Sequence, residues 1–338
     1  MTRKINGVPI EASTDLSGIT GGEVFKWSGT GVVLEDQDGT SLIPITWYGG
    51  RGVFGGGNTG NVTNIIDYIT IATTGNATDF GDLSDIRRYL SACSNGTRGV
   101  FGGGRDDVHL NVIEYITIST PGNATDFGDL TQARHQISAC SDGTKGVFGG
   151  GNDNISPYRV TTIDYITIAT TGNALDFGDL TSIRSNLAAC SDGTKGVFGG
   201  GDDNASVNTI DYITIATTGN ALDFGDLTAA RYFISACSSD VRGVFSGGYN
   251  DAGDLLNMLD YITIASTGNA TDFGDLTVGT ISVSACSDGS RGIFAGGMNS
   301  GWTKINTIDY IAIATTGNAT DFGDLTAARA DLAATSGG

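Results

Sequence analysis

The chain has 338 residues, including 53 glycines and 4 prolines, and 37 acidic against 18 basic residues give it a formal charge of −19. This charge repels phosphate backbones and anionic lipid, so nucleic acid and membrane surfaces are poor candidate partners. The glycines follow no Gly-X-Y triplet, which excludes collagen, and an apolar content of 39% excludes a disordered chain.

Residues 1–50 differ from the rest of the chain and predict an extended arm or a small β-element. They are polar and rich in Gly and Thr, with apolar residues at Val24, Phe25 and Trp27. They contain no apolar run typical of a secretory signal, and no stretch of the chain reaches the roughly 20 apolar residues of a membrane span.

A unit of about 47 residues is repeated six times after the arm. Each copy has a Gly-Val-Phe or Gly-Ile-Phe opening with glycines after it, an apolar-acid-Tyr segment, and the phrase Asp-Phe-Gly-Asp-Leu. The openings start at Gly52, Gly99, Gly146, Gly196, Gly243 and Gly292. A fixed period of this size is typical of propellers, solenoids and repeat arrays.

One copy, residues 131–179, predicts four short strands joined by turns. The expected strands are 131–140, 145–148, 163–169 and 174–177. Four short strands per unit describe one propeller blade. The alternative is an α/β solenoid in which segments such as 227–236 are helices, since alanine favours helix. The β-branched residues of 278–284, in the same slot, argue for a strand.

The two ends of the chain indicate a closed ring. The chain stops after 328–335, which matches the first strand of a unit, whereas the unit that opens at residue 51 has only the atypical residues 45–48 before it. If the C-terminal strand completes that blade, the ring has no exposed sheet edge.

Glycine doublets after an apolar strand, followed in each copy by a tyrosine, resemble the kelch repeat over residues 51–338. The kelch tryptophan has no counterpart, and Phe80 and its equivalents can fill its place. We therefore predict an all-β, six-bladed, kelch-like β-propeller at 51–338, closed by the C-terminal strand, with an N-terminal arm at 1–50.

Several residues recur in every copy and are expected to be structural. The five cysteines predict small buried residues rather than disulfides or a metal cluster. The Asp-Phe-Gly-Asp acids are expected to cap turns and to pair with the recurring Arg88, Arg134, Arg184, Arg231 and Arg329. The basic residue before each opening is expected to balance charge, and the acid before each tyrosine to face solvent.

Length and sequence vary mainly in one loop per copy, of 8 to 11 residues, and in a second stretch that flanks Arg134 and its equivalents. In an antiparallel blade both stretches emerge on the same face, where recognition usually lies. We select nine charged or aromatic residues of the first of these stretches as candidate binding residues: Arg105, Asp106, Asp107, His109, Tyr158, Arg159, Tyr249, Trp302 and Lys304.

Residues 16–30 resemble short segments that recur in tail-fibre and other virion proteins of bacteriophages. The resemblance implies a non-enzymatic virion structural or tail-associated protein in a multi-copy assembly. Val24, Phe25 and Trp27 would anchor it to other virion proteins, and the variable loops would contact a host glycan or receptor or another virion protein, without cofactor or metal. The alternatives are a propeller-type carbohydrate-active enzyme, with acids in the channel or variable loops, and an intracellular kelch-type adaptor in the cytoplasm.

Overall fold

The computed structural model describes residues 4–5, 8–9, 24–27, 32–35, 49–156 and 158–338. The chain divides into two compact units, Met1–Ile45 and Thr46–Gly338. The first contains two antiparallel strand pairs: β1 (Lys4–Ile5) with β2 (Val8–Pro9), and β3 (Val24–Trp27) with β4 (Val32–Glu35). The backbone of the predicted anchor thus lies in β3, and its side chains lie outside the described part of the structure.

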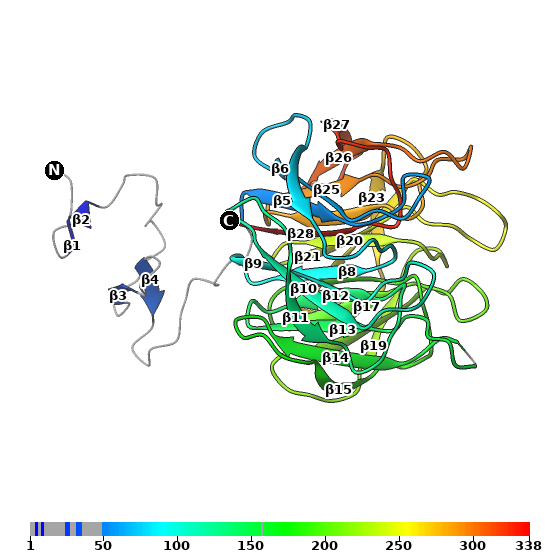
Figure 1. The fold of residues 1–338 in the computed structure, drawn as a ribbon, viewed down its shortest axis with the longest axis horizontal. Coiled ribbons are helices and arrows are strands. Elements are labelled where there is room, and N and C mark those ends of the chain that lie inside the picture. The colour runs from blue at the N-terminus through cyan, green and yellow to red at the C-terminus, as the bar shows by residue number, and fades with distance from the viewer. Residues whose placement is uncertain (1–3, 6–7, 10–23, 28–31, 36–48, 157) are drawn as a thin grey trace. The chain divides into compact units, whose positions relative to one another are not determined.

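The second unit is a ring of six four-stranded antiparallel sheets (Figure 1). The innermost strands are β8 (Ser91–Ser94), β12 (Ser138–Ser141), β16 (Ala188–Ser191), β20 (Ser235–Ser238), β24 (Ser284–Ser287) and β28 (Ala333–Gly337). The second strands are β5 (Arg51–Gly55), β9 (Arg98–Gly102), β13 (Lys145–Gly149), β17 (Lys195–Gly199), β21 (Arg242–Ser246) and β25 (Arg291–Ala295).

The two outer positions of each blade are equally regular. The third strands are β6 (Ile65–Thr70), β10 (Val112–Thr117), β14 (Thr162–Thr167), β18 (Thr209–Thr214), β22 (Met258–Thr263) and β26 (Thr307–Ala312). The outermost strands are β7 (Thr78–Asp82), β11 (Thr125–Asp129), β15 (Leu175–Asp179), β19 (Leu222–Asp226), β23 (Thr271–Asp275) and β27 (Thr320–Asp324).

The C-terminal strand closes the ring. β28 pairs with β5, from Ala333 opposite Gly55 to Gly337 opposite Arg51, so the first blade is built from both ends of the unit. The predicted all-β, six-bladed propeller is confirmed. The helical alternative is wrong, because the described residues contain only strands, turns and irregular segments. None of the described residues forms an apolar helix of membrane-spanning length.

The hydrophobic core lies between the blades rather than within one of them. Val147, Ile163 and Phe177 of one blade pack with Phe198 and Ile213 of the next, and every blade boundary repeats this cluster. Both faces of each blade are therefore covered by neighbours. The prediction that the acid before each tyrosine faces solvent is wrong for this reason.

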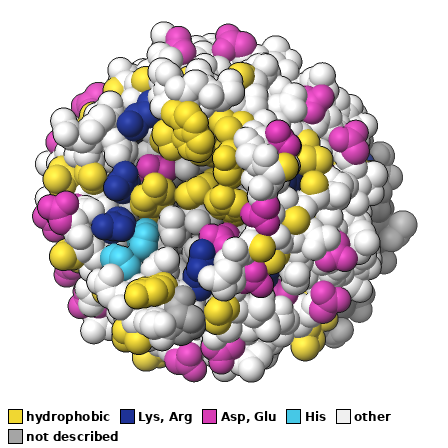
Figure 2. All heavy atoms as spheres, turned by 90° about the vertical axis from the view of Figure 1, so that its right-hand side faces the viewer, with side chains coloured by type: hydrophobic (Ala, Val, Ile, Leu, Met, Phe, Trp, Pro, Cys, Tyr) yellow, Lys and Arg dark blue, Asp and Glu magenta, His cyan; other side chains and the backbone are white. Residues whose placement is uncertain are grey.

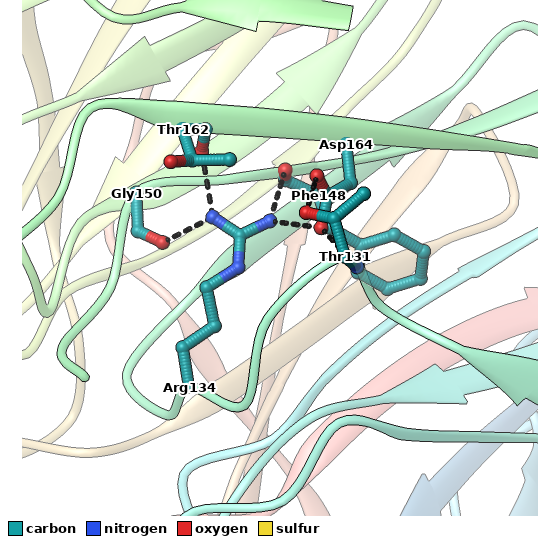
Figure 3. Close-up of polar contacts among 6 residues, drawn as sticks. All are labelled: Thr131, Arg134, Phe148, Gly150, Thr162 and Asp164. Carbon is teal, nitrogen blue, oxygen red and sulfur yellow. Dashed lines mark hydrogen bonds and ion pairs between the residues drawn. The ribbon is translucent and has the colours of Figure 1, made fainter. Parts of the chain in front are cut away.

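The buried acid binds the recurring arginine, as the third blade illustrates (Figure 3). Arg134 Nη1 donates to the carbonyls of Gly150 and Thr162, at 2.8 and 2.6 Å. Its Nη2 donates to the Phe148 carbonyl and the Asp164 carboxylate, at 3.1 and 2.8 Å. The guanidinium thus fastens the link from one blade to the strands of the next. We call this site the arginine niche.

The niche corrects two sequence-based predictions. The arginines pair with the acid before each tyrosine, not with the Asp-Phe-Gly-Asp acids, and the arginine that occupies the niche in the first link is Arg87 rather than Arg88. The five pairs are Arg87–Glu114, Arg134–Asp164, Arg184–Asp211, Arg231–Asp260 and Arg329–Asp67.

One niche lacks its arginine. Thr280 stands at the equivalent position, is buried, and has a hydroxyl without a hydrogen-bond partner. Among the described residues, Thr277 is the one donor to the carboxylate opposite, Asp309. Burial raises the pKa of Asp309, and the hydrogen bonds from Thr277 offset this rise only in part. In this blade, the niche therefore holds a buried acid without an arginine beside it.

The Asp-Phe-Gly-Asp phrase forms a joint between neighbouring blades. Asn173 Oδ1 accepts from the N–H of Asp129 at 3.1 Å, and the N–H of Ala174 donates to the Asp129 carbonyl at 2.8 Å. Gly128 has a φ of 146°, and a Cβ there would lie 2.5 Å from the Gly172 carbonyl oxygen. Only glycine allows this approach, so the phrase recurs for packing.

The remaining repeated residues also contact the neighbouring blade. The Arg98 guanidinium lies 4.5 Å from the Tyr115 ring centroid and donates to the Ala169 carbonyl at 2.9 Å. Its partners among the described residues are this ring and the carbonyl oxygens of Ile168 and Ala169, so the expected charge balance does not rest on an ion pair of Arg98. All five cysteines are free and buried, as predicted. Phe177, the equivalent of Phe80 in this blade, meets Tyr165 edge-on with ring centroids 5.9 Å apart.

Candidate binding face at the channel mouth

The two variable stretches of each copy meet on one face of the ring. The first residue of each variable loop forms a backbone bridge with the residue after the niche position: Asn58–Ala330, Arg88–Arg105, His135–Asn152, Ser185–Asp202, Tyr232–Tyr249 and Ile281–Met298. We call this surface the variable face. Figure 2 shows apolar side chains gathered near its centre, with histidine and Lys or Arg side chains beside them on one side.

Six residues, one per link, surround the mouth of the central channel on this face. They are Tyr89, Gln136, Asn186, Phe233, Ser282 and Asp331, and all six differ in type. Each has a φ between 55° and 63°, a left-handed conformation that is uncommon for such residues. This conformation lets each N–H donate to the carbonyl of the preceding link, at 2.8 to 3.2 Å, in a closed circle. We call these residues the mouth ring.

Two aromatic members of the mouth ring meet across the channel axis. Tyr89 and Phe233 come from opposite links, and their rings stack with centroids 6.3 Å apart and planes 29° apart. A hollow of about 70 Å³ remains among the mouth-ring residues. Below it, buried Leu, Ile and Val side chains separate the mouth from a channel cavity of about 130 Å³ lined by Ser and Ala.

Further aromatic side chains extend from the stacked pair toward both sides. On one side His135 lies 5.7 Å from Tyr89 and 4.3 Å from His109, measured between ring centroids. On the other side a series of contacts at 5.1 to 5.9 Å joins Phe233 to Tyr232, Tyr249 and Trp302. The result is a continuous band of rings over the mouth, which we call the aromatic band. Trp302 at its end is 58% exposed.

Basic residues outside the repeated pattern lie on the same face. Of the 18 Lys and Arg residues, three belong to the arm, six precede the openings and five occupy the niches. The other four are Arg88, Arg105, Arg159 and Lys304, all within the variable stretches. Both histidines of the chain, His109 and His135, are there too.

The structure separates the predicted site residues into four groups by their surroundings. Arg105 and His109 lie beside the mouth, where Arg105 bridges both His109 and Arg88 through its backbone. Tyr249 and Trp302 belong to the aromatic band. Lys304 lies close enough to Asp331 to lower the pKa of that carboxyl.

The other predicted residues have more local contacts. Arg159 pairs with Asp202 at 2.6 Å and donates to Asn204. Asp106 accepts from the N–H of Val108, which lowers its pKa. Asp107 and Tyr158 are exposed.

The sequence-based selection missed several residues of the mouth. Tyr89, His135, Tyr232, Phe233 and Asp331 all belong to the second variable stretch, which the selection did not include. The signal was present, because the two positions after the niche arginine differ in every copy while their neighbours repeat. Misassigning Arg88 to the niche also hid the basic side chain nearest Tyr89.

Burial perturbs the titratable groups of the mouth. Burial, aided by Asp331, raises the pKa of Tyr89 to about 12. Burial also raises the pKa of Asp331, although the Ser282 hydroxyl, Arg88 and Lys304 each act to lower it. Burial, with His109 and Arg105 nearby, lowers the pKa of His135 to about 3, so this imidazole is neutral at pH 7.

The mouth combines flat apolar rings with hydrogen-bonding and charged groups, an arrangement suited to holding a small ligand or a polymer chain. Over the described residues, no three His, Cys, Asp or Glu side chains are grouped as a metal site would require. In comparisons with known proteins, no protein-family model matches the chain, and no curated protein matches it in sequence.

Proposed function

We propose that the protein is a non-enzymatic carbohydrate-binding propeller whose variable face holds a glycan over the channel mouth. One observation carries the proposal. Within residues 49–338, every aromatic residue outside the sixfold core lies on the variable face. These residues are Tyr89, Tyr232, Phe233, Tyr249 and Trp302 of the aromatic band, and Tyr158 outside the band. The repeated scaffold does not require them, so their placement calls for another explanation.

A glycan fits the chemistry of this face. Sugar rings present C–H faces that lie on flat aromatic rings and hydroxyl edges that need hydrogen-bond partners. Tyr and Trp provide both kinds of surface at little entropic cost. The aromatic band contains seven rings in successive contact, and Gln136, Asn186 and Ser282 place amide and hydroxyl groups beside it at the mouth.

The arrangement of acids favours binding over catalysis. Glycoside hydrolysis typically uses two carboxyl groups that flank the scissile bond. Among the described residues that line the mouth and channel, Asp331 is the one acid. The twelve Asp-Phe-Gly-Asp acids are on the outermost strands, away from the channel.

A glycan microarray probed with the full-length protein tests the proposal. The wild type is expected to bind a subset of glycans, and a Tyr249→Ala and Trp302→Ala double variant is expected to lose that binding. Tyr158→Ala is the matched control, because Tyr158 is an exposed aromatic on the same face with no ring contact to the band. Absence of binding, or equal loss in the control, contradicts the proposal.

We also propose that the protein is a virion component, present in several copies and attached through residues 1–50 to other virion proteins. The resemblance of residues 16–30 to virion segments supports this role, with Val24, Phe25 and Trp27 as the anchor. Cryo-electron microscopy of particles from the native source, labelled with an antibody against the propeller, tests it. Labelled particles are the expected result, and unlabelled particles with free soluble protein contradict it.

A further inference from the structure

One side of the variable face concentrates positive charge beside the aromatic band. Its four members are Arg88, Arg105, His109 and His135, which we call the basic corner. We infer that the basic corner binds the carboxylate of an acidic sugar, while the sugar ring lies on Tyr89 and Phe233. The inference rests on the proposed glycan binding and specifies the chemical class of the glycan.

The backbone brings the members of the basic corner together from three consecutive links and loops. Arg88 and Arg105 exchange two hydrogen bonds of 2.9 Å across their bridge, and Arg105 bridges His109 in the same loop. The two imidazoles are in contact at 4.3 Å between centroids. The Arg88 guanidinium lies 5.1 Å from the Tyr89 ring centroid, so it reaches the mouth directly.

The two arginines of the basic corner lack the carboxylate partner that the niche arginines and Arg159 have. Each niche arginine is paired with an acid, and Arg159 on the same face is paired with Asp202 at 2.6 Å. Among the described residues, neither Arg88 nor Arg105 lies within 4 Å of a carboxylate. Arg105 has only long contacts, 3.4 and 3.5 Å, to carbonyls of its own loop.

The histidines report the same crowding of positive charge. Burial and the nearby Arg105 lower the pKa of His109, although Asp153 acts to raise it. Nδ1 of His109 is buried without a hydrogen-bond partner, whereas Nδ1 of His135 contacts the Asn152 carbonyl at 3.2 Å. Neutral imidazoles suit sugar hydroxyls, so the charge for a carboxylate comes from the arginines.

The acids near the basic corner leave room for a ligand anion. Asp106 is engaged with the N–H of Val108, and Asp107 is exposed in the same loop. Asp153 is buried, and its Oδ1 accepts from the N–H of Ile155. Asp331 faces the mouth, and Lys304 as well as Arg88 lowers its pKa. Lys304 therefore remains beside Asp331 when Arg88 turns toward a ligand.

Matched pairs of glycans test the inference with the full-length protein. The probes are sialyllactose against lactose, and a galacturonate oligosaccharide against its carboxyl-reduced form. We expect the acidic member of at least one pair to bind about tenfold or more tightly, as charge-assisted hydrogen bonds from arginine predict. Raising the salt concentration should weaken the binding of that acidic member and leave neutral binding unchanged.

An Arg88→Gln and Arg105→Gln double variant should reduce acidic binding to the neutral level, and Arg105→Gln alone should reduce it in part. Arg159→Gln is the matched control and should retain the preference, because it removes an arginine of the same face that is already paired. Equal binding of acidic and neutral members contradicts this inference alone, as does an equal fall in the control. A protein that binds no glycan of either kind contradicts the proposed function itself.

Discussion

The repeated scaffold and the variable face are built from the same six copies, yet their side chains have different surroundings. Where the copies agree, as at Arg134, Gly128 and Asn173, the side chain or backbone contacts the next blade. Where they differ, as at Tyr89 and Trp302, the side chain faces the mouth or solvent. Within this chain, repeated residues therefore mark the contacts between blades, and residues that differ between the copies mark the candidate site.

The largest effect is expected from removing the acid of an occupied niche. Asp164→Asn leaves the buried Arg134 guanidinium without its counter-charge, and breaking such a buried pair costs about 3–5 kcal/mol. Asp309→Asn is the matched control, because its niche has no arginine and the change removes an unpaired charge. Urea unfolding at pH 7 measures both. Equal losses would show that the ion pair does not account for the niche.

A smaller loss is expected at the joint between blades. Gly128→Ala places a Cβ 2.5 Å from the Gly172 carbonyl and strains a left-handed φ, so we expect a loss of about 1–3 kcal/mol. Gly122→Ala is the control, since a Cβ there meets nothing within 4 Å. Thermal unfolding of the two variants should differ clearly, and a loss in Gly122→Ala as large as in Gly128→Ala would contradict the joint.

The niche that lacks an arginine predicts a pH-dependent difference in stability between Asp309→Asn and the wild type. Burial raises the folded-state pKa of Asp309. Its favourable contribution to the free energy of unfolding is therefore complete below the unfolded-state pKa, and it is lost as the pH rises through the folded-state pKa. Asp309→Asn removes this dependence. The variant should therefore gain stability over the wild type at pH 7 and lose that gain on acidification toward pH 4. A constant difference across this range would contradict the assignment.

The smallest effect on stability is expected on the variable face. Trp302→Ala removes an exposed ring that fastens no blade to its neighbour, so the free energy of unfolding should change by about 0.5 kcal/mol or less. Its effect on glycan binding should be much larger. A strong loss of stability, measured by urea unfolding, would place Trp302 with the scaffold instead of the site.

The sequence predicted the propeller because its signal is repeated six times, and the C-terminal strand indicated the closure. It did not predict the environment of the acids, because strand alternation does not show that blades cover each other on both faces. The mouth ring was missed for a related reason. Tyr89 and Phe233 lie three repeat units apart in the sequence, and only closure of the ring places them opposite each other.

A loop chimera tests whether the variable face is the glycan-binding site. In it, the variable loops 58–65, 105–112, 152–162, 249–258 and 298–307 are replaced by the sequence of residues 202–209, and glycan binding is measured beside the wild type. We expect the chimera to unfold as cooperatively as the wild type and to lose binding to the glycans that the wild type binds. A chimera that binds the same glycans with unchanged affinity would contradict it.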